Sequence, residues 1–174
     1  MADSDSLFYL RTQYYLGQLI LFRLSVLRGH GTQNTYLIVG AYQNVAKNPL
    51  PPTESPEYLP TLLYTARAHI ALSNPASALA LVQADVQPAV RAIRALASYL
   101  QAKSTSSDVE AILDELRDLA IEVEGEEDTQ AESGAGSSVV RVAAATAFVA
   151  EGELEEALTT LGAGADKGVS DLEW

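Results

Sequence analysis

Side chains that carry out chemistry are scarce and scattered in this sequence. There is no Cys, and the two histidines, His30 and His69, lie too far apart to suggest a metal-binding motif. His30 stands between two glycines, which is typical of a solvated loop, and His69 is expected to be a partly buried structural residue of a helix. No Gly-x-Ser-x-Gly nucleophile motif occurs. We therefore predict no catalytic, cofactor-binding or metal-binding residues.

Carboxylates gather at helical spacing in one stretch, at Asp114, Glu115, Asp118 and Glu122. Such a group is capable of acid–base work, but its hydrophilic surroundings are typical of a solvated helix face. The pair Gly162-x-Gly164 has part of the spacing of a phosphate-binding loop, yet it follows a predicted helix rather than a strand, which favours helix capping. An enzyme is therefore not expected.

Composition and charge are those of one globular domain with an acidic second half. Of 174 residues, 48% are apolar and 20% are charged, and the net charge is −12. Residues 1–100 hold seven Lys/Arg and five Asp/Glu, a net of +2, whereas residues 101–174 hold four and eighteen, a net of −14. This acidity disfavours binding to nucleic acid or anionic lipid. It favours solubility or a basic partner.

No targeting segment is predicted. The apolar stretch Leu16–Leu27 is interrupted by Gly17, Gln18 and Arg23, and it is shorter than the roughly 20 apolar residues of a membrane-spanning helix. The chain opens with acidic residues, unlike a signal peptide. We expect a soluble, cytosolic protein.

The elements that must position these side chains are mainly helices. Pro75 fits the first position of a helix, and the cluster Ser104–Ser107 is suited to capping. Three helical pairs are predicted, over 60–72 with 75–84, 88–103 with 108–122, and 138–151 with 154–161. Before them we predict a helix over 5–16, a β-favouring run over 35–39, a short helix from Tyr42 and a proline-rich loop over 49–56.

The helical pairs repeat a tetratricopeptide-like pattern, which favours an all-α solenoid of antiparallel helix pairs. Small residues that allow two helices to approach recur as Ala78 and Ala157, with Ile112 in the middle pair, and Gly152 permits the tight turn of the third pair. The third pair carries the pattern most fully, at Ala145, Phe148, Gly152, Leu154, Ala157 and Leu161. Generic antiparallel helices are the alternative.

An interruption breaks the first repeat. Tyr14–Gly17 has the pattern of the end of a first helix, and Gly40–Val45 that of the following turn and second helix, whereas residues 18–40 between them have neither. We interpret 18–40 as an insertion. The predicted organisation is a helical-repeat domain over 1–161 with this insertion and a flexible acidic loop over 123–137, followed by a loose tail over 162–174.

Four stretches resemble the epsilon subunit of coatomer, in the order in which that family has them. They are Leu7-Phe8 with Tyr14–Gly17, Ala41–Gln43, residues 89–100 and residues 143–161. The resemblance implies an incomplete tetratricopeptide-like array, because the family continues with further repeats. It also implies a structural, non-enzymatic subunit of the COPI vesicle coat in Golgi-to-ER and intra-Golgi transport, without cofactors.

The partner implied by the resemblance is the C-terminal region of the alpha coatomer subunit, together with the rest of coatomer. Membrane association would be indirect, and the protein would be cytoplasmic and peripheral on Golgi membranes and COPI-coated vesicles. The alternative is a tetratricopeptide-type peptide-binding adaptor or co-chaperone. That function would favour a Lys, Asn and Arg cluster that clamps a carboxylate, which the expected binding faces lack.

Partner contacts are expected on the inner face of the first helix of each pair. Arg67 and Arg94 are suited to bidentate pairing with a partner carboxylate, with a solvated surface residue as the alternative for each. The predicted set is Leu63, Arg67 and Ile70 from the first pair, Arg94, Ala97 and Gln101 from the second, and Val142, Thr146 and Val149 from the third.

Overall fold

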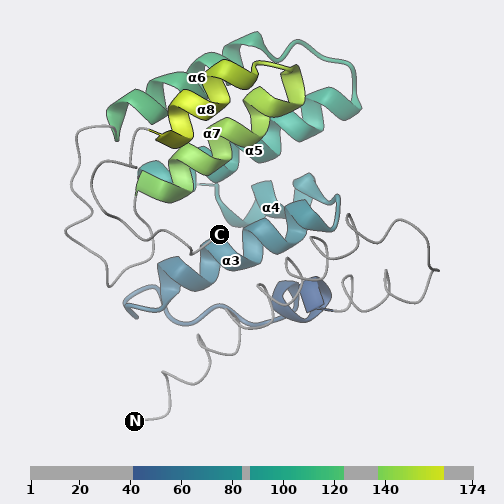
Figure 1. Cartoon of the computed structure of the whole chain (residues 1–174). Helices are drawn as coiled ribbons and strands as arrows, with labels where there is room; N and C mark the ends of the chain where they lie inside the picture. Colours follow the sequence, from purple (N-terminus) through teal and green to yellow (C-terminus); the bar gives the residue numbers. More distant parts are fainter. Residues whose placement is uncertain (1–40, 84–86, 124–136, 163–174) are drawn as a thin grey trace, which may run out of the picture.

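The computed structural model describes residues 41–83, 87–123 and 137–162, and every regular element in these ranges is a helix (Figure 1). A short helix spans 41–46. Six longer helices follow as α3 (Tyr58–Ala71), α4 (Pro75–Leu81), α5 (Pro88–Ser104), α6 (Glu110–Glu122), α7 (Ser137–Glu151) and α8 (Leu154–Gly162). The predicted all-α fold of helix pairs is confirmed. The predicted helix over 5–16, the β-favouring run over 35–39 and the insertion over 18–40 lie outside the described residues.

Local sequence explains where these helices begin. The side chain of Asn74 caps α4 by accepting a hydrogen bond from the Ser77 N–H at 3.2 Å, and Pro75 occupies the first turn. Pro88 likewise occupies the first turn of α5, and the residue before it, Gln87, has an extended backbone conformation. The helices begin and end within three residues of their predicted bounds. The predicted acidic loop over 123–137 is shorter at both ends. Val123, only 2% exposed, caps α6, and Ser137, which is also buried, is the first residue of α7.

The turn inside each helix pair has the same backbone structure in all three pairs. One residue per turn has a positive φ: Ser73 at 57°, Ser106 at 55° and Gly152 at 86°. Each of these residues donates its N–H to the carbonyl three residues before it, and the next residue donates to the carbonyl five before it, as Asn74 to His69, Ser107 to Ala102 and Glu153 to Phe148. This is the Schellman motif, which satisfies the last carbonyls of a helix. The repeat predicted from the sequence is therefore present in the backbone, as the same turn structure in each pair.

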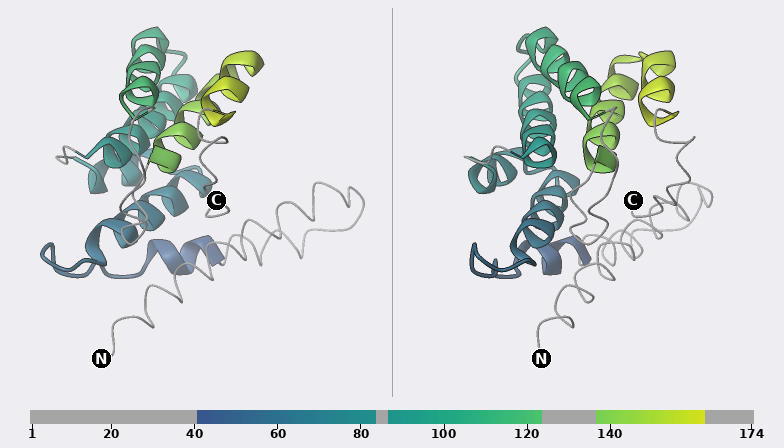
Figure 2. Two further views of the ribbon diagram at one scale, coloured as in Figure 1. Left: turned by 60° about the vertical axis from the view of Figure 1, so that its left-hand side comes forward. Right: turned by 90° about the vertical axis from the view of Figure 1, so that its left-hand side faces the viewer.

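The pairs stack so that the first helix of each new pair packs against both helices of the pair before it. α5 packs against α3 and α4, and α7 packs against α5 and α6. We call α3, α5 and α7 the first helices and α4, α6 and α8 the second helices. Figure 2 shows α8 at the outer end of the stack, on the far side of α7 from α5. One apolar core runs through the array and includes Leu63, Ile93, Tyr99, Leu116 and Phe148.

Candidate partner-binding surface

The nine predicted contact positions divide into interior and accessible side chains. Leu63 and Ala97 belong to the core, with 2% and 0% of their surface exposed. Arg67 is 6% exposed, and its guanidinium lies 5.5 Å from the centre of the Tyr64 ring. These three side chains are covered because α3 is buried along most of its length, over 60–68, and because Ala97 lies in the tightly packed core of α5. These three side chains therefore do not lie on an open face of the described structure, and partner contact by the nine residues stays a prediction.

The other six positions retain solvent contact. Ile70 is half-buried against the core, and Arg94 and Val142 are half-buried as well. Gln101, Thr146 and Val149 are exposed, and Val149 keeps 54% of its surface in solvent. Val142, Thr146 and Val149 are spaced i, i+4, i+7, so they share one face of α7. Arg94 and Gln101 are seven residues apart and share one face of α5.

Carboxylates of α6 meet the arginines of α5. Arg91 Nη1 lies 3.1 Å from Glu122 Oε2, and Arg94 Nη2 lies 3.6 Å from Glu115 Oε1. The Arg94 contact is an ion pair beyond ordinary hydrogen-bond length, and both side chains are more than a third exposed. Such a pair contributes little to stability. The group predicted to be a solvated acidic face is therefore partly a set of contacts between helices.

A second polar contact joins α5 to the end of α7. The Tyr99 hydroxyl donates to Glu151 Oε1 at 2.6 Å, and Lys103 Nζ lies 2.8 Å from the same oxygen. Hydrogen bonds from Lys103 and Tyr99 lower the pKa of the Glu151 carboxyl below its usual range. Burial, followed by the hydrogen bond to Glu151, raises the pKa of the Tyr99 phenol. The sequence pattern alone did not point to this contact, although Tyr99 and Lys103 stand one helical turn apart.

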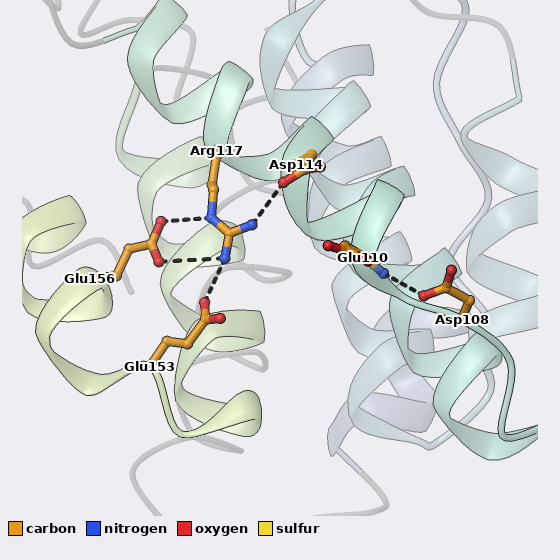
Figure 3. A network of polar contacts seen from close by, with 6 residues as sticks. All are labelled: Asp108, Glu110, Asp114, Arg117, Glu153 and Glu156. Atoms are coloured by element: carbon orange, nitrogen blue, oxygen red, sulfur yellow. Dashed lines mark hydrogen bonds and ion pairs between the residues drawn. The ribbon is translucent and has the colours of Figure 1, made fainter.

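Arg117 of α6 is the centre of a third polar network (Figure 3). Its guanidinium donates at 2.8 Å to Asp114 of its own helix, to Glu153 in the turn before α8 and to Glu156 of α8. The guanidinium also lies 5.4 Å from the centre of the Phe148 ring of α7. The hydrogen bond to Glu156, followed by that to Asp114 and by the charges of Glu156 and Glu153, raises the pKa of Arg117 against the opposing effect of burial. This network ties the second and third helix pairs together.

Two of the hollows on the described surface are lined by residues of the helix pairs, and neither lining resembles a catalytic site. The larger, of about 590 Å³, lies between the loop before α3 and the end of α4, and its polar lining consists of hydroxyls and amides such as Tyr58, Gln83 and Gln87. The smaller, of about 220 Å³, lies between α6, α7 and α8, and its charged residues, Arg117 and Glu156, are already paired.

Comparison with known proteins decides what this helical array is. The family model for the coatomer epsilon subunit matches residues 31–169, which include all three helix pairs. The chain belongs to the coatomer epsilon subunit family. The predicted resemblance is thereby confirmed, although the match begins inside the stretch interpreted as an insertion and does not reach Leu7–Gly17. No curated protein and no solved structure gave a significant match.

Membership of the coatomer epsilon family assigns the chain a structural, non-enzymatic role in the COPI vesicle coat, with the other coatomer subunits as its partners. Among the described residues, no helix is long and apolar enough to cross a membrane. In the same ranges, no three His, Cys, Asp or Glu residues are grouped as a metal site would need. His69 lies half-buried in the last turn of α3, where burial lowers its pKa, whereas His30 lies outside the described residues.

Proposed function

We propose that this coatomer epsilon family member binds the C-terminal region of the alpha coatomer subunit through the accessible faces of its first helices. In this proposal the chain is a cytoplasmic protein that reaches Golgi membranes and COPI vesicles through the coat. There it supports Golgi-to-ER and intra-Golgi transport. The proposal rests on the family and on one geometric observation, the adjacency of α5 and α7.

The observation that carries the proposal is that α5 and α7 pack side by side and each keeps a set of predicted contact residues accessible. On α7 these are Val142, Thr146 and Val149, which combine two apolar side chains with one hydroxyl. On α5 they are Arg94 and Gln101. A mixed apolar and polar surface of this kind suits a protein partner better than a small molecule.

Arg94 provides the charged contact of the proposed surface. Because its 3.6 Å pairing with Glu115 is long and exposed, a carboxylate of the partner can replace Glu115 at low cost. Arg67 is buried, with its guanidinium facing the Tyr64 ring, and takes no part in the proposed surface. Leu63 and Ala97 support the surface from within by packing.

The test is binding of the full chain to the purified alpha coatomer C-terminal region, measured by isothermal titration calorimetry. Thr146→Arg and Val149→Asp place a large or charged group on the α7 face, and both positions are exposed, so the fold is expected to persist. We expect each to weaken binding by about tenfold or more, because an interface tolerates unpaired charge poorly. Ile121→Gln is the control, since Ile121 is an apolar residue of α6 that is 67% exposed, against 54% for Val149.

Full-strength binding by both α7 variants would refute the proposed surface. A loss of binding that is equal in the Ile121→Gln control would refute it as well. A parallel titration with a chain that lacks residues 18–40 tests the insertion hypothesis. Equal binding by both chains is expected for a tolerated insertion, and binding by the deletion chain alone would mean that the insertion damages the partner site.

A further inference from the structure

Four consecutive hydroxyl residues, Ser104–Ser107, end α5 and form the turn that leads to α6. All four are exposed, and Figure 1 shows the connection from α5 to α6 at the edge of the stack. This turn belongs to the middle pair, and helices of the first and third pairs pack on either side of it in the described structure. Its exposure is therefore a property of the array, because both neighbouring pairs leave the turn uncovered.

The structure distinguishes the last of these hydroxyls from the other three. Ser104 Oγ donates to the Gln101 carbonyl at 2.7 Å, and Thr105 Oγ1 lies 3.2 Å from the same oxygen. Ser106 has the left-handed backbone conformation, with φ at 55°. Ser107 lies outside both helices, and its hydroxyl is 2.8 Å from Thr105 Oγ1. The Ser107 hydroxyl thus contacts a side chain of the turn, whereas its neighbours contact the helix backbone or have the left-handed conformation.

Acidic residues follow Ser107 at two positions where acid-directed serine kinases recognise negative charge in a substrate. Asp108 is the next residue and Glu110 is the third residue after the serine, and both are exposed. Residues 107–109 adopt neither helix nor strand. Asp108 accepts the Glu110 N–H at 3.0 Å (Figure 3), and within the described ranges neither carboxylate pairs with a Lys or Arg. Both charges are therefore available to a basic partner.

We propose that Ser107 is a phosphorylation site for an acid-directed serine kinase. Its Oγ attacks the γ-phosphorus of ATP, the bond from that phosphorus to the bridging oxygen breaks, ADP leaves, and the kinase takes the hydroxyl proton. Basic side chains of the kinase contact Asp108 and Glu110 and so align the hydroxyl for attack. The product carries about 1.5–2 additional negative charges at pH 7. The site does not depend on the binding of alpha coatomer.

The experiment incubates the full chain with ATP and a purified acid-directed serine kinase, and follows phosphate by mass spectrometry after trypsin digestion. Cleavage after Lys103 and Arg117 releases one peptide, residues 104–117, in which the four hydroxyls of the turn are the only Ser or Thr side chains. Fragmentation of this peptide therefore assigns the modified residue. A kinase that recognises basic residues, used at equal activity, is the comparison enzyme.

Three variants test the role of each group. Ser107→Ala removes the acceptor hydroxyl, and Glu110→Gln removes the carboxylate three residues after it. Asp118→Asn is the matched control, because it removes one charge from another exposed position of α6. The pattern Ser-Asp-x-Glu recurs at Ser170, which lies outside the described residues and gives an internal measure of kinase activity.

We expect phosphate on Ser107 at equal rates in the unmodified chain and in Asp118→Asn. Glu110→Gln should slow the reaction by about tenfold or more, because a charge-assisted contact with the kinase is lost. Ser107→Ala should leave the 104–117 peptide unmodified. The comparison kinase should modify Ser107 at least about tenfold more slowly. Circular dichroism of each variant checks that the helices persist, as substitution at exposed positions predicts.

Several results would overturn the proposal. One is the absence of phosphate on Ser107, and phosphate on Ser170 in the same sample would show that the kinase was active. Phosphate on another hydroxyl of the turn in place of Ser107 would contradict the assignment from the side-chain contacts. Equal rates for Glu110→Gln and Asp118→Asn would remove the charge argument. Phosphate that is added to Ser107 only above the Tm would mean that the folded chain does not present this serine.

Discussion

The left-handed residue in each turn gives the sharpest test of the repeat structure. At Gly152, with φ at 86°, an added Cβ would meet no atom within 4 Å, so substitution by alanine produces no clash. The cost of Gly152→Ala is then the backbone strain of an L-residue in this region, about 1–2 kcal/mol. Reduced freedom of the unfolded chain offsets about 0.4–1 kcal/mol of it. We expect a net loss of about 1 kcal/mol.

The opposite change is expected at the equivalent turn of the second pair. Ser106, with φ at 55°, already carries the strain, so Ser106→Gly relieves it and should stabilise the chain by about 0.5–1 kcal/mol. For a chain of this size, 1 kcal/mol corresponds to a shift in Tm of roughly 2–4 °C. Thermal and urea unfolding followed by circular dichroism will resolve both changes.

Gly162→Ala is the matched control for these variants. Gly162 is the last residue of α8, an added Cβ there also meets nothing within 4 Å, and its φ is not in the left-handed region. Alanine at this position should be neutral or slightly stabilising, because alanine is the better helix former. If Gly152→Ala behaved like Gly162→Ala, or if Ser106→Gly destabilised the chain, the argument from the shared turn would be refuted.

Three further predictions concern the contacts between the helix pairs. Arg117→Met should destabilise the chain by about 1–2 kcal/mol in urea unfolding, because it leaves three carboxylates facing one another. This figure is discounted for the 30% exposure of the side chain. Arg91→Met, at a more exposed pair, should cost less than about 0.5 kcal/mol, and equal losses would contradict the central role of Arg117. Because hydrogen bonds lower the pKa of Glu151 in the folded state, its contribution to stability is complete above its usual pKa of 4.5 and is lost as the pH falls through the lowered value. The fall in Tm on acidification below pH 4.5 should therefore be smaller in Glu151→Gln, and an unchanged acid profile would exclude this role. Ala157→Leu should destabilise by about 1–3 kcal/mol in thermal unfolding, because Ala157 is buried where α8 packs against α7 and a larger side chain would overpack this contact. Ala150→Leu, at an exposed position of α7, is its control, and a stable Ala157→Leu chain would mean that the two helices do not need a small residue.

Helix positions were predictable from the sequence because local signals specify them. Pro75 and Pro88 mark first turns, and the apolar periodicity of α5 and α7 is long enough to identify a helix. Gly152 identified its turn, since glycine adopts positive φ without strain. The turns at Ser73 and within Ser104–Ser107 were also predicted, but serine rarely adopts positive φ, and only the structure shows that Ser73 and Ser106 take this conformation.

The accessible surface was harder to predict than the helices. The spacing of Leu63, Arg67 and Ile70 places them on one face of a helix, but it does not reveal that α3 is buried on every side over 60–68. Burial of Arg67 depends on the packing of whole elements rather than on local sequence. The same holds for the contacts of Tyr99 with Glu151 and of Arg117 with Glu153, which join residues far apart in the chain.

The polar contacts between the second and third pairs join two chemically different surfaces. α5 and α6 supply the cations Lys103 and Arg117, whereas α7, α8 and the turn between them supply Glu151, Glu153 and Glu156. The junction is thus heterologous, with different surfaces on its two sides. The pairs are therefore not interchangeable modules. A chain in which the third pair was duplicated behind itself would place Val149 and Gly162 where the second pair has Lys103 and Arg117, so the carboxylates of the copy would lose their cationic partners.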